Sequence, residues 1–227
     1  MNDFLVYLGI GIMLIAILFA YQYYNVRFTK QLSIILYKDK KVKDFLEQLE
    51  SIKGKLFVRK KQREILKLDA YAIANDRQAL LKQFEYLETL KLSYGKKISL
   101  YEKEVLYYAN NKENEKAETA YNKLIELGSQ IENDRMDKIL AEARITMEVY
   151  VYRNGSFASK LVDLAKVSDN KMAKGLNYYR ASRCYYYLND KENVLKYLKK
   201  AENNLTSKEW RHHIDLCKND FSQLEKM

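Results

Sequence analysis

Proline is absent from the 227-residue sequence, and glycine occurs only seven times. An ordinary proline content of about 5 % would give roughly eleven residues. Proline and glycine interrupt helices, whereas Lys, Glu, Leu and Ala favour them, so the composition predicts an all-α chain with short turns. The twenty tyrosines are bulky enough to fill the spaces between such helices.

The sequence also has only two cysteines and two histidines. Two cysteines do not make a disulfide framework, and they fit a reducing compartment. A tetrahedral metal site needs four nitrogen or sulfur ligands, so it would require all of Cys184, His212, His213 and Cys217. Cys217, however, falls on the apolar stripe of the last predicted helix, which favours a buried thiol. We expect no metal and no cofactor.

Catalytic motifs are missing as well. The sequence contains no glycine-rich phosphate loop and no HExxH, GxSxG or CxxC pattern. Acidic residues such as Glu102 and Glu104 occur singly on helical patterns, where a solvated face is the default. Without a convergent set of reactive side chains, we expect a binding or structural protein and no enzyme.

One long apolar run is present at the start. Phe4–Ala20 has no charged residue, and Tyr21, Tyr23 and Tyr24 follow it. This approaches the ~20 residues that a helix needs to cross a bilayer, and tyrosines are enriched at membrane interfaces. A signal peptide or a buried core helix are the alternatives. A signal peptide would have basic residues before the run and a small-x-small cleavage site after it, and this segment has neither. We therefore predict that residues 1–24 are a retained transmembrane anchor.

Basic residues follow the anchor and do not precede it, and such residues stay on the cytoplasmic side. The sequence thus predicts a single-pass protein of the cell membrane with its N-terminus outside. Residues 25–68 have a net charge of +8, which favours contact with anionic lipids. Binding of nucleic acid is the alternative, but none of its usual motifs is present. The predicted membrane-surface residues are Arg27, Lys30, Lys38, Lys40, Lys41 and Lys43.

Polar turn clusters recur along the rest of the chain, each between two apolar-periodic segments. They begin near Asp39, Asn75, Asn110, Asn154 and Asn189, at intervals of 36, 35, 44 and 35 residues. The segment Gly128–Asp134 (GSQIEND) explains the longest interval as an extended loop. A helix–turn–helix unit with a period near 34 is typical of tetratricopeptide repeats.

Residues 60–205 resemble the tetratricopeptide family, best in the unit around Asn189. There Tyr178, Ala181, Ser182, Tyr185, Val194, Leu198 and Ala201 stand at the family's marked positions. The unit at 101–127 matches with Tyr101, Val105, Tyr108, Ala117, Tyr121 and Leu124, and the unit before it with Leu68, Tyr71, Leu80, Phe84 and Leu87. A weaker unit has Val149, Tyr152, Leu161 and Ala165. The family's closing proline is absent, and Glu104 and Glu148 replace its leucine.

The predicted fold is a transmembrane helix followed by a right-handed α-solenoid of about five tetratricopeptide-like hairpins. Its parts are the anchor (1–24), a basic membrane-proximal hairpin (25–59), the repeats (60–205) and a capping helix (206–227). The last helix would begin at the capping box Thr206-x-x-Glu209. Its apolar stripe is Trp210, Ile214, Cys217, Phe221 and Leu224, which would close the open end of the array.

The resemblance implies binding of a protein or peptide. In stacked hairpins the first helix of each pair lines the concave side, and aromatic and arginine side chains are enriched at binding hot spots. The repeat register places five such residues there: Tyr150, Arg153, Tyr179, Arg183 and Tyr186. Two guanidinium groups could hold a carboxylate, so we expect an acidic or C-terminal peptide. The alternative for these tyrosines is packing between helices.

The sequence therefore predicts a non-catalytic, membrane-anchored cytoplasmic scaffold. A second hypothesis is a structural subunit of a membrane complex that assembles through the transmembrane helix, in which Ala16-x-x-x-Ala20 is a small-xxx-small pair. The third is nucleic-acid binding through the basic segment, which a salt-dependent gel shift would reveal.

The charge asymmetry around the apolar run makes the topology testable. We expect a reporter fused to the C-terminus to be active in the cytoplasm and protected from reagents added to intact cells, because Lys and Arg flank only that side. A reporter fused to the N-terminus is the matched control and should be labelled from outside. Labelling of the C-terminal reporter in intact cells would contradict the predicted orientation.

Overall fold

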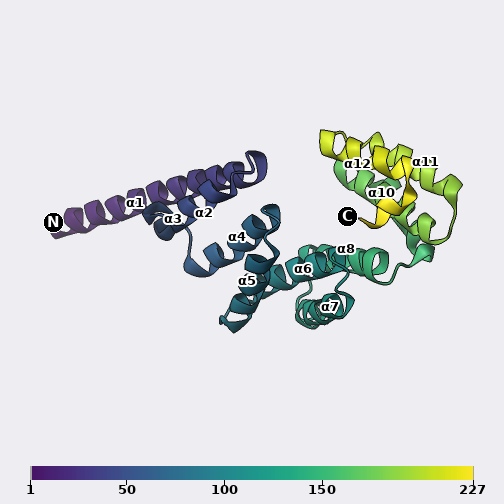
Figure 1. Ribbon diagram of the computed structural model, residues 1–227. Helices are drawn as coiled ribbons and strands as arrows, with labels where there is room; N and C mark the ends of the chain where they lie inside the picture. Colours follow the sequence, from purple (N-terminus) through teal and green to yellow (C-terminus); the bar gives the residue numbers. More distant parts are fainter. Residues whose placement is uncertain (1, 227) are drawn as a thin grey trace. The chain divides into compact units, whose positions relative to one another are not determined.

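The computed structural model describes the backbone of residues 2–226, and the burial of all of these except residues 2–6 and Gly9. In that range the chain forms twelve α-helices and no strand, which confirms the all-α prediction (Figure 1). The helices are α1 Asn2–Ser33, α2 Val42–Glu50, α3 Ile52–Phe57, α4 Lys60–Ile73, α5 Arg77–Thr89, α6 Tyr94–Asn110, α7 Asn114–Gly128, α8 Asp134–Thr146, α9 Ala158–Val167, α10 Lys171–Tyr187, α11 Lys191–Glu202 and α12 Lys208–Asn219.

The chain divides into two compact units after Leu100. The first unit contains α1 to α5 and the start of α6, and the second contains the rest of α6 and α7 to α12. Each unit has its own hydrophobic core, and we describe them separately.

Helix α1 changes character along its length. The segment Ile10–Lys38 is long and apolar enough to cross a bilayer, and 0 % of its most apolar stretch is buried. Phe4 to Val6, the beginning of the predicted span, lie outside the residues whose side chains are described. Further along, Phe28 and Leu32 are buried in a core with Leu36, Phe45 and Leu49. The helix therefore continues without a break past residue 24, the predicted end of the anchor, into the core of the first unit.

A salt-bridge group holds α4 to the end of α2. The Lys67 ammonium lies 2.9 Å from a Glu50 oxygen and 3.0 Å from a Glu64 oxygen. The hydrogen bond from Lys67 keeps the pKa of the Glu50 carboxyl below its usual value. Arg63 donates from Nη1 to the Val58 carbonyl at 2.8 Å, which ties the start of α4 to the segment that follows α3.

All five predicted turn clusters lie between helices. One residue in the left-handed region, with φ between 52° and 59°, lies in or directly beside each cluster: Lys40, Asn75, Lys112, Arg153 and Asn189. In three turns the next amide then bonds a carbonyl five residues back, as in the Schellman motif that commonly ends a helix. These bonds are Asp76 N to Tyr71 O (3.0 Å), Glu113 N to Tyr108 O (2.9 Å) and Asp190 N to Tyr185 O (3.0 Å).

The other two turns follow a π-helical turn, Ile34–Lys38 after α1 and Met147–Val151 after α8. There the amide reaches six residues back, from Lys41 to Ile35 (3.0 Å) and from Asn154 to Glu148 (2.9 Å). A π turn inserts one extra residue and so rotates the residues that follow it. This explains why Tyr152, predicted to match a repeat position, is exposed, while Val151 is buried.

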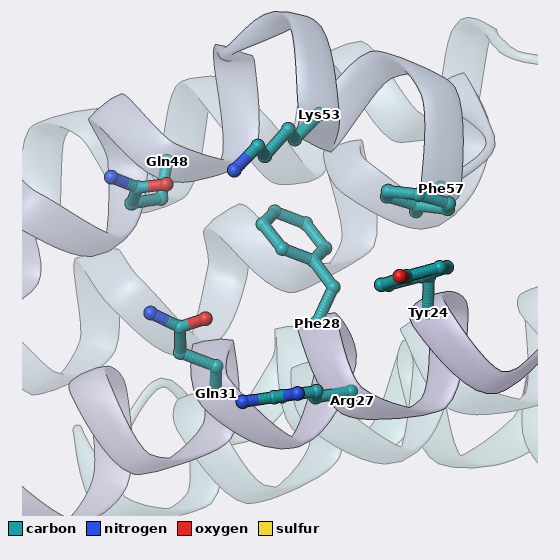
Figure 2. A pocket seen from close by; sticks show the side chains of 7 residues that line it. All are labelled: Tyr24, Arg27, Phe28, Gln31, Gln48, Lys53 and Phe57. Atoms are coloured by element: carbon teal, nitrogen blue, oxygen red, sulfur yellow. The ribbon is translucent and has the colours of Figure 1, made fainter.

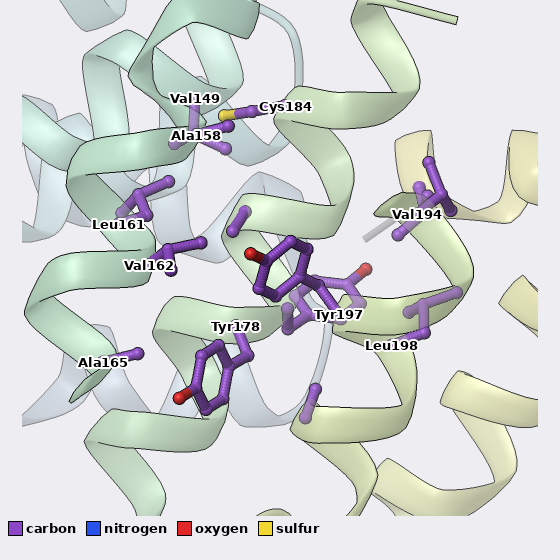
Figure 3. Close-up of a cluster of buried hydrophobic side chains, with 14 of the residues drawn as sticks. Val149, Ala158, Leu161, Val162, Ala165, Tyr178, Cys184, Val194, Tyr197 and Leu198 are labelled. Carbon is purple, nitrogen blue, oxygen red and sulfur yellow. The ribbon is translucent and has the colours of Figure 1, made fainter. Parts of the chain in front are cut away.

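In the second unit, α9 and α11 both pack against α10. The core contains Tyr178, Leu161, Val162, Tyr197 and Leu198, which Figure 3 shows between these helices. The Tyr197 ring stacks on Tyr185 with centroids 5.2 Å apart and lies 6.0 Å from Tyr178. The tyrosines of this unit thus fill the space between helices, as the composition predicts.

The cap of α11 is the second residue of the predicted turn pair Asn189-Asp190, and the predicted cap of the last helix is wrong by one residue. The side chain of Asp190, and not Asn189, accepts a hydrogen bond from the Asn193 amide, because Asn189 occupies the left-handed position that ends α10. At α12 the cap is Ser207, and not Thr206. Ser207 has the extended backbone that a cap requires, and its Oγ accepts from the Trp210 amide at 3.3 Å.

The predicted capping helix is present, but its apolar stripe is divided between two elements. Ile214 and Cys217 lie on α12, whereas Leu224 lies on a 3₁₀ turn, Phe221–Glu225, after the helix has ended. All three are buried in the core of the second unit. The C-terminal segment therefore covers α10 and α11.

Gly54 makes the α2–α3 junction testable. A Cβ at this position would lie 2.2 Å from the Leu49 carbonyl oxygen and 2.5 Å from that of Gln48, so α3 would have to move. We expect Gly54→Ala to destabilise the junction by about 1–3 kcal/mol. Hydrogen exchange of the α2 and α3 amides in the full-length protein should become faster.

Gly95→Ala is the matched control for this substitution. A Cβ at Gly95 meets nothing within 4 Å, and alanine favours a helix over glycine by about 1 kcal/mol. Exchange should therefore be unchanged or slower in this variant. Equal exchange of α2 and α3 in the wild type and in Gly54→Ala would contradict the close packing at Gly54.

Candidate functional site

Tyr179, one of the five predicted partner-binding residues, is completely buried, with 0 % of its surface exposed. Its ring lies 5.4 Å from that of Trp210 and its hydroxyl is 2.8 Å from His213 Nε2, both on α12. Burial raises the pKa of the Tyr179 hydroxyl, which stays protonated. Because α12 covers this face of α10, Tyr179 is a packing residue in this arrangement.

Arg183 is also buried, with 4 % exposed, and interacts with two tyrosines. Its guanidinium carbon lies 4.5 Å from the centre of the Tyr150 ring, and its Nε donates to the Tyr187 hydroxyl at 2.6 Å. Such a buried cation–π contact contributes about 2 kcal/mol. Replacing Arg183 by an acid would therefore disturb this packing before it could report on binding.

Arg153 is exposed and lies at the edge of the same cluster. Its guanidinium is 5.3 Å from the Tyr187 ring and forms an ion pair with Glu225 of the C-terminal turn. Tyr186 is half-buried and contacts the Tyr187 ring. Arg153 and Arg183 therefore both contact Tyr187, and Arg183 also contacts the Tyr150 ring. Sequence reasoning missed Tyr187, although its spacing of four residues from Arg183 on one helix was a signal.

A second surface feature lies between α7, α8 and α9. It is a groove of about 420 Å³, and its lining is largely apolar. Phe157 and Ile145 form its buried part, and Ile125 and Leu140 its more open part. Two cations stand at the groove: Arg144, and Lys160, whose ammonium lies 5.4 Å from the Phe157 ring. The prediction from the repeat register did not include this groove, because it considered only the first helix of each hairpin.

The two thiols are both buried. Burial raises the pKa of Cys184 to about 12 and that of Cys217 to about 11, so both remain protonated near neutral pH. His213 Nε2 lies 3.5 Å from Cys217 Sγ in addition to its contact with Tyr179. Among the residues whose side chains the structure describes, no group of three or more His, Cys, Asp or Glu is placed to hold a metal.

The predicted membrane-surface residues are all exposed, but they lie at two different positions along the axis of α1, one next to the apolar run and one at the far end of the helix. Arg27 and Lys30 follow the apolar run directly. Lys38 is about 21 Å further along the helix axis from Tyr24, at 1.5 Å per residue. Lys40, Lys41 and Lys43 surround the turn at that far end. The chain then returns through α2, and α3 brings Lys53 and Lys55 back beside the part of α1 around Tyr21 and Asn25.

A groove between α1 and α3 lies at this nearer level (Figure 2). Its volume is about 570 Å³, and it is lined by Arg27, Phe28, Lys53, Phe57, Tyr24, Gln31 and Gln48. Only Arg27 of these residues was predicted to lie at the membrane surface. Lys53 is 26 residues further along the sequence than Arg27. It lies in the same groove because α3 packs against α1.

Comparisons of the chain with family models, with curated proteins and with solved structures give no match. The resemblance to tetratricopeptide repeats, the solenoid arrangement and the membrane span therefore stay predictions.

His213 makes the α10–α12 contact testable by pH. Burial lowers its pKa, and the neighbouring His212 and Arg183 lower it further. The unfolded chain therefore binds a proton more readily, with a pKa of about 6.5. Above about pH 6.5 His213 is neutral in both the folded and the unfolded protein, and the stability of the fold is complete. As the pH falls below about 6.5 the unfolded chain takes up a proton first, so the free energy of unfolding should decrease between pH 7 and pH 5.5.

The single tryptophan, Trp210, provides the signal, since its ring lies 6.2 Å from that of His213. Denaturant unfolding of the full-length protein in detergent, followed by Trp210 fluorescence, would measure the effect. His213→Gln should lose much of this pH dependence, whereas the control His212→Gln, at an exposed position, should keep most of it. Identical pH profiles of the two variants would contradict the assignment to His213.

Proposed function

We infer that this protein is a membrane-anchored scaffold without catalytic activity. In this proposal α1 spans the bilayer, and the two helical units lie in the cytoplasm. The second unit binds a protein partner there and keeps it close to the membrane.

The observation that carries the proposal is the contrast within α1. From Tyr7 to Phe19 the large apolar side chains are exposed, whereas Phe28 and Leu32 are buried in the core of the first unit. An apolar surface of this extent in water would mark a site of interaction. A bilayer supplies that interaction to a helix of this length. Because α1 is one helix, the membrane span and the first hairpin are connected without a flexible linker.

The groove between α7, α8 and α9 supports the binding of a partner. Apolar clefts with a few polar groups at the edge are typical of helix-binding surfaces. Arg144 and Lys160 give this groove a positive edge, which favours an acidic partner. We therefore place an amphipathic segment with acidic residues in this groove. This replaces the predicted surface around Tyr179 and Arg183, whose side chains are buried.

The proposal assigns no reaction to the chain. The raised pKa values of Cys184 and Cys217 keep both as thiols, which are poor nucleophiles. His213 is half-buried between Tyr179 and Cys217 and lines neither of the two grooves.

A second candidate is a structural subunit of a membrane complex. It is favoured by Ala16 and Ala20, which share one face of the exposed part of α1 and would let another membrane helix approach closely. In that case the specific contacts would lie within the bilayer, and the sequence of the anchor itself would be essential.

Site-specific photo-cross-linking in native membranes tests the scaffold. A cross-linker in place of Ile125, which is exposed in the groove, should capture an acidic segment of one partner. Lys160→Glu should lower the yield about tenfold, as expected for the loss of one charge-assisted contact. Lys171→Glu, an exposed site outside the groove, is the control with the same change in charge and should leave the yield unchanged.

Two further arms make the result decisive. A cross-linker at Leu195, an exposed residue of α11, should not capture the same partner. Replacing residues 4–20 by an unrelated apolar helix should preserve the Ile125 adduct. Capture independent of Lys160 would contradict the groove, and loss of the adduct with the replaced helix would favour the structural subunit.

A further inference from the structure

Helix α3 is fixed to the part of α1 that follows the apolar run. The Tyr21 hydroxyl donates to the Leu56 carbonyl at 3.2 Å, and Asn25 Nδ2 donates to the Phe57 carbonyl at 2.9 Å. The Phe57 ring lies 5.6 Å from that of Tyr21 and 5.9 Å from that of Phe28. These contacts set the level of α3 along α1, opposite Tyr21 to Phe28.

The groove enclosed by these helices combines aromatic and cationic groups. Figure 2 shows the rings of Tyr24, Phe28 and Phe57 near one another, with Lys53 above Phe28 and Arg27 below it. No carboxylate lines the groove. Its polar edge therefore has two positive charges and nothing within the lining to balance them.

The polar side chains around the groove have no partners in the described part of the chain. Arg27 and Lys53 form no ion pair there, and the side chains of Gln31 and Gln48 form no hydrogen bond. Glu50, two residues after Gln48 on α2, pairs with Lys67 of α4. Four groups that could bind an anionic, hydroxyl-bearing ligand are thus left available at one place.

The outer face of α3 adds a second, independent observation. Ile52 is 87 % exposed and Leu56 is 61 % exposed, although both belong to a short helix that also has Lys53 and Lys55. Exposed apolar side chains beside lysines are typical of helices that lie at the boundary between headgroups and acyl chains. Tyr21 to Tyr24, at the same level of α1, fit this boundary as well.

We propose that the groove between α1 and α3 binds one anionic phospholipid. The phosphate lies between Arg27 and Lys53, where a guanidinium can hold two phosphate oxygens and an ammonium a third. Gln31 and Gln48 bind headgroup hydroxyls. The acyl chains follow Tyr24 and the exposed apolar side of α1 into the bilayer. The site rests on the proposed membrane span, since only a membrane brings a phospholipid to this level.

The headgroup and its source follow from the lining. A zwitterionic lipid carries a cationic group next to its phosphate, and Arg27 and Lys53 would repel that group. An anionic lipid has no such group, so the lining favours an anionic headgroup. Grooves of about 300–1,000 Å³ are typical for bound small molecules, so one headgroup with the start of its chains fits. A soluble phosphoester has no acyl chain to cover the exposed Tyr24 ring of the groove or the exposed Leu56 beside it, and we therefore assign the site to a lipid.

Native mass spectrometry of the full-length protein, purified in mild detergent and titrated with defined lipids, tests the site. Wild type should bind a single phosphatidylglycerol about tenfold or more tightly than phosphatidylcholine. Arg27→Gln with Lys53→Gln should lower the phosphatidylglycerol affinity at least about tenfold, because two charge-assisted contacts are lost. Both side chains are exposed, so the fold should be kept, which circular dichroism verifies.

The matched control is Lys38→Gln with Lys43→Gln. It removes the same two charges from the same basic segment, but both residues lie near the far end of α1 and outside the groove. The affinity of this control variant for phosphatidylglycerol should change by less than about twofold, because exposed charges more than a Debye length away from the groove are largely screened. Equal losses in the two double variants would overturn the site in favour of diffuse attraction.

Two other results would also overturn the proposal. One is equal binding of phosphatidylglycerol and phosphatidylcholine. The other is complete competition by excess glycerol phosphate, which would assign the groove to a soluble phosphoester. Carbonate extraction of membranes separates these failures from failure of the anchor. If the protein stays in the membrane while the lipid results fail, only the site is wrong, and if it is extracted, the membrane span is wrong too.

Discussion

The tight reversal of the chain after α1, α4, α6, α8 and α10 is the constraint on which both units depend. Each reversal uses one residue with positive φ, and none of these residues is glycine. Left-handed backbone costs about 1–2 kcal/mol for an ordinary side chain. The cost is tolerated because the reversal satisfies the last carbonyls of one helix and places the next helix antiparallel to it. Burial between the paired helices then outweighs the strain.

Pairing alone leaves one face of each hairpin uncovered, so the next element has to cover it. In the second unit, α10 is covered by α9 on one side and by α11 on another, and α12 covers what remains around Tyr179. The tyrosines complete this packing through stacked rings and through the cations of Arg183 and Lys200. The same coverage removes Tyr179 and Arg183 from the surface. The open surface lies instead at the groove between α7, α8 and α9, where Ile125 is still exposed.

The sequence predicted those features that depend on local chemistry. The pairs Asn75-Asp76 and Asn189-Asp190 were predicted as turns, and the structure has turns at both. In each, asparagine takes the positive φ and the aspartate side chain caps the following helix. The features that it could not predict depend on register and on contacts distant in sequence. The π turn Met147–Val151 shifts the fourth hairpin by one residue, which places Tyr152 in solvent and Arg153 in the left-handed position. No periodicity in the sequence signals that extra residue.

The positions of charged residues in the candidate sites could not be predicted from the sequence for the same reason. Arg27 and Lys38 belong to one basic segment of the sequence, yet a rigid helix separates them by about 16 Å along its axis, twice the Debye length at physiological salt. Lys53 is more distant in sequence and shares a groove with Arg27, because Asn25 and Tyr21 hold α3 in place. The level of a charge along α1 is therefore decided by tertiary contacts. For a helix that enters a bilayer, that level determines whether the charge meets a headgroup or only water.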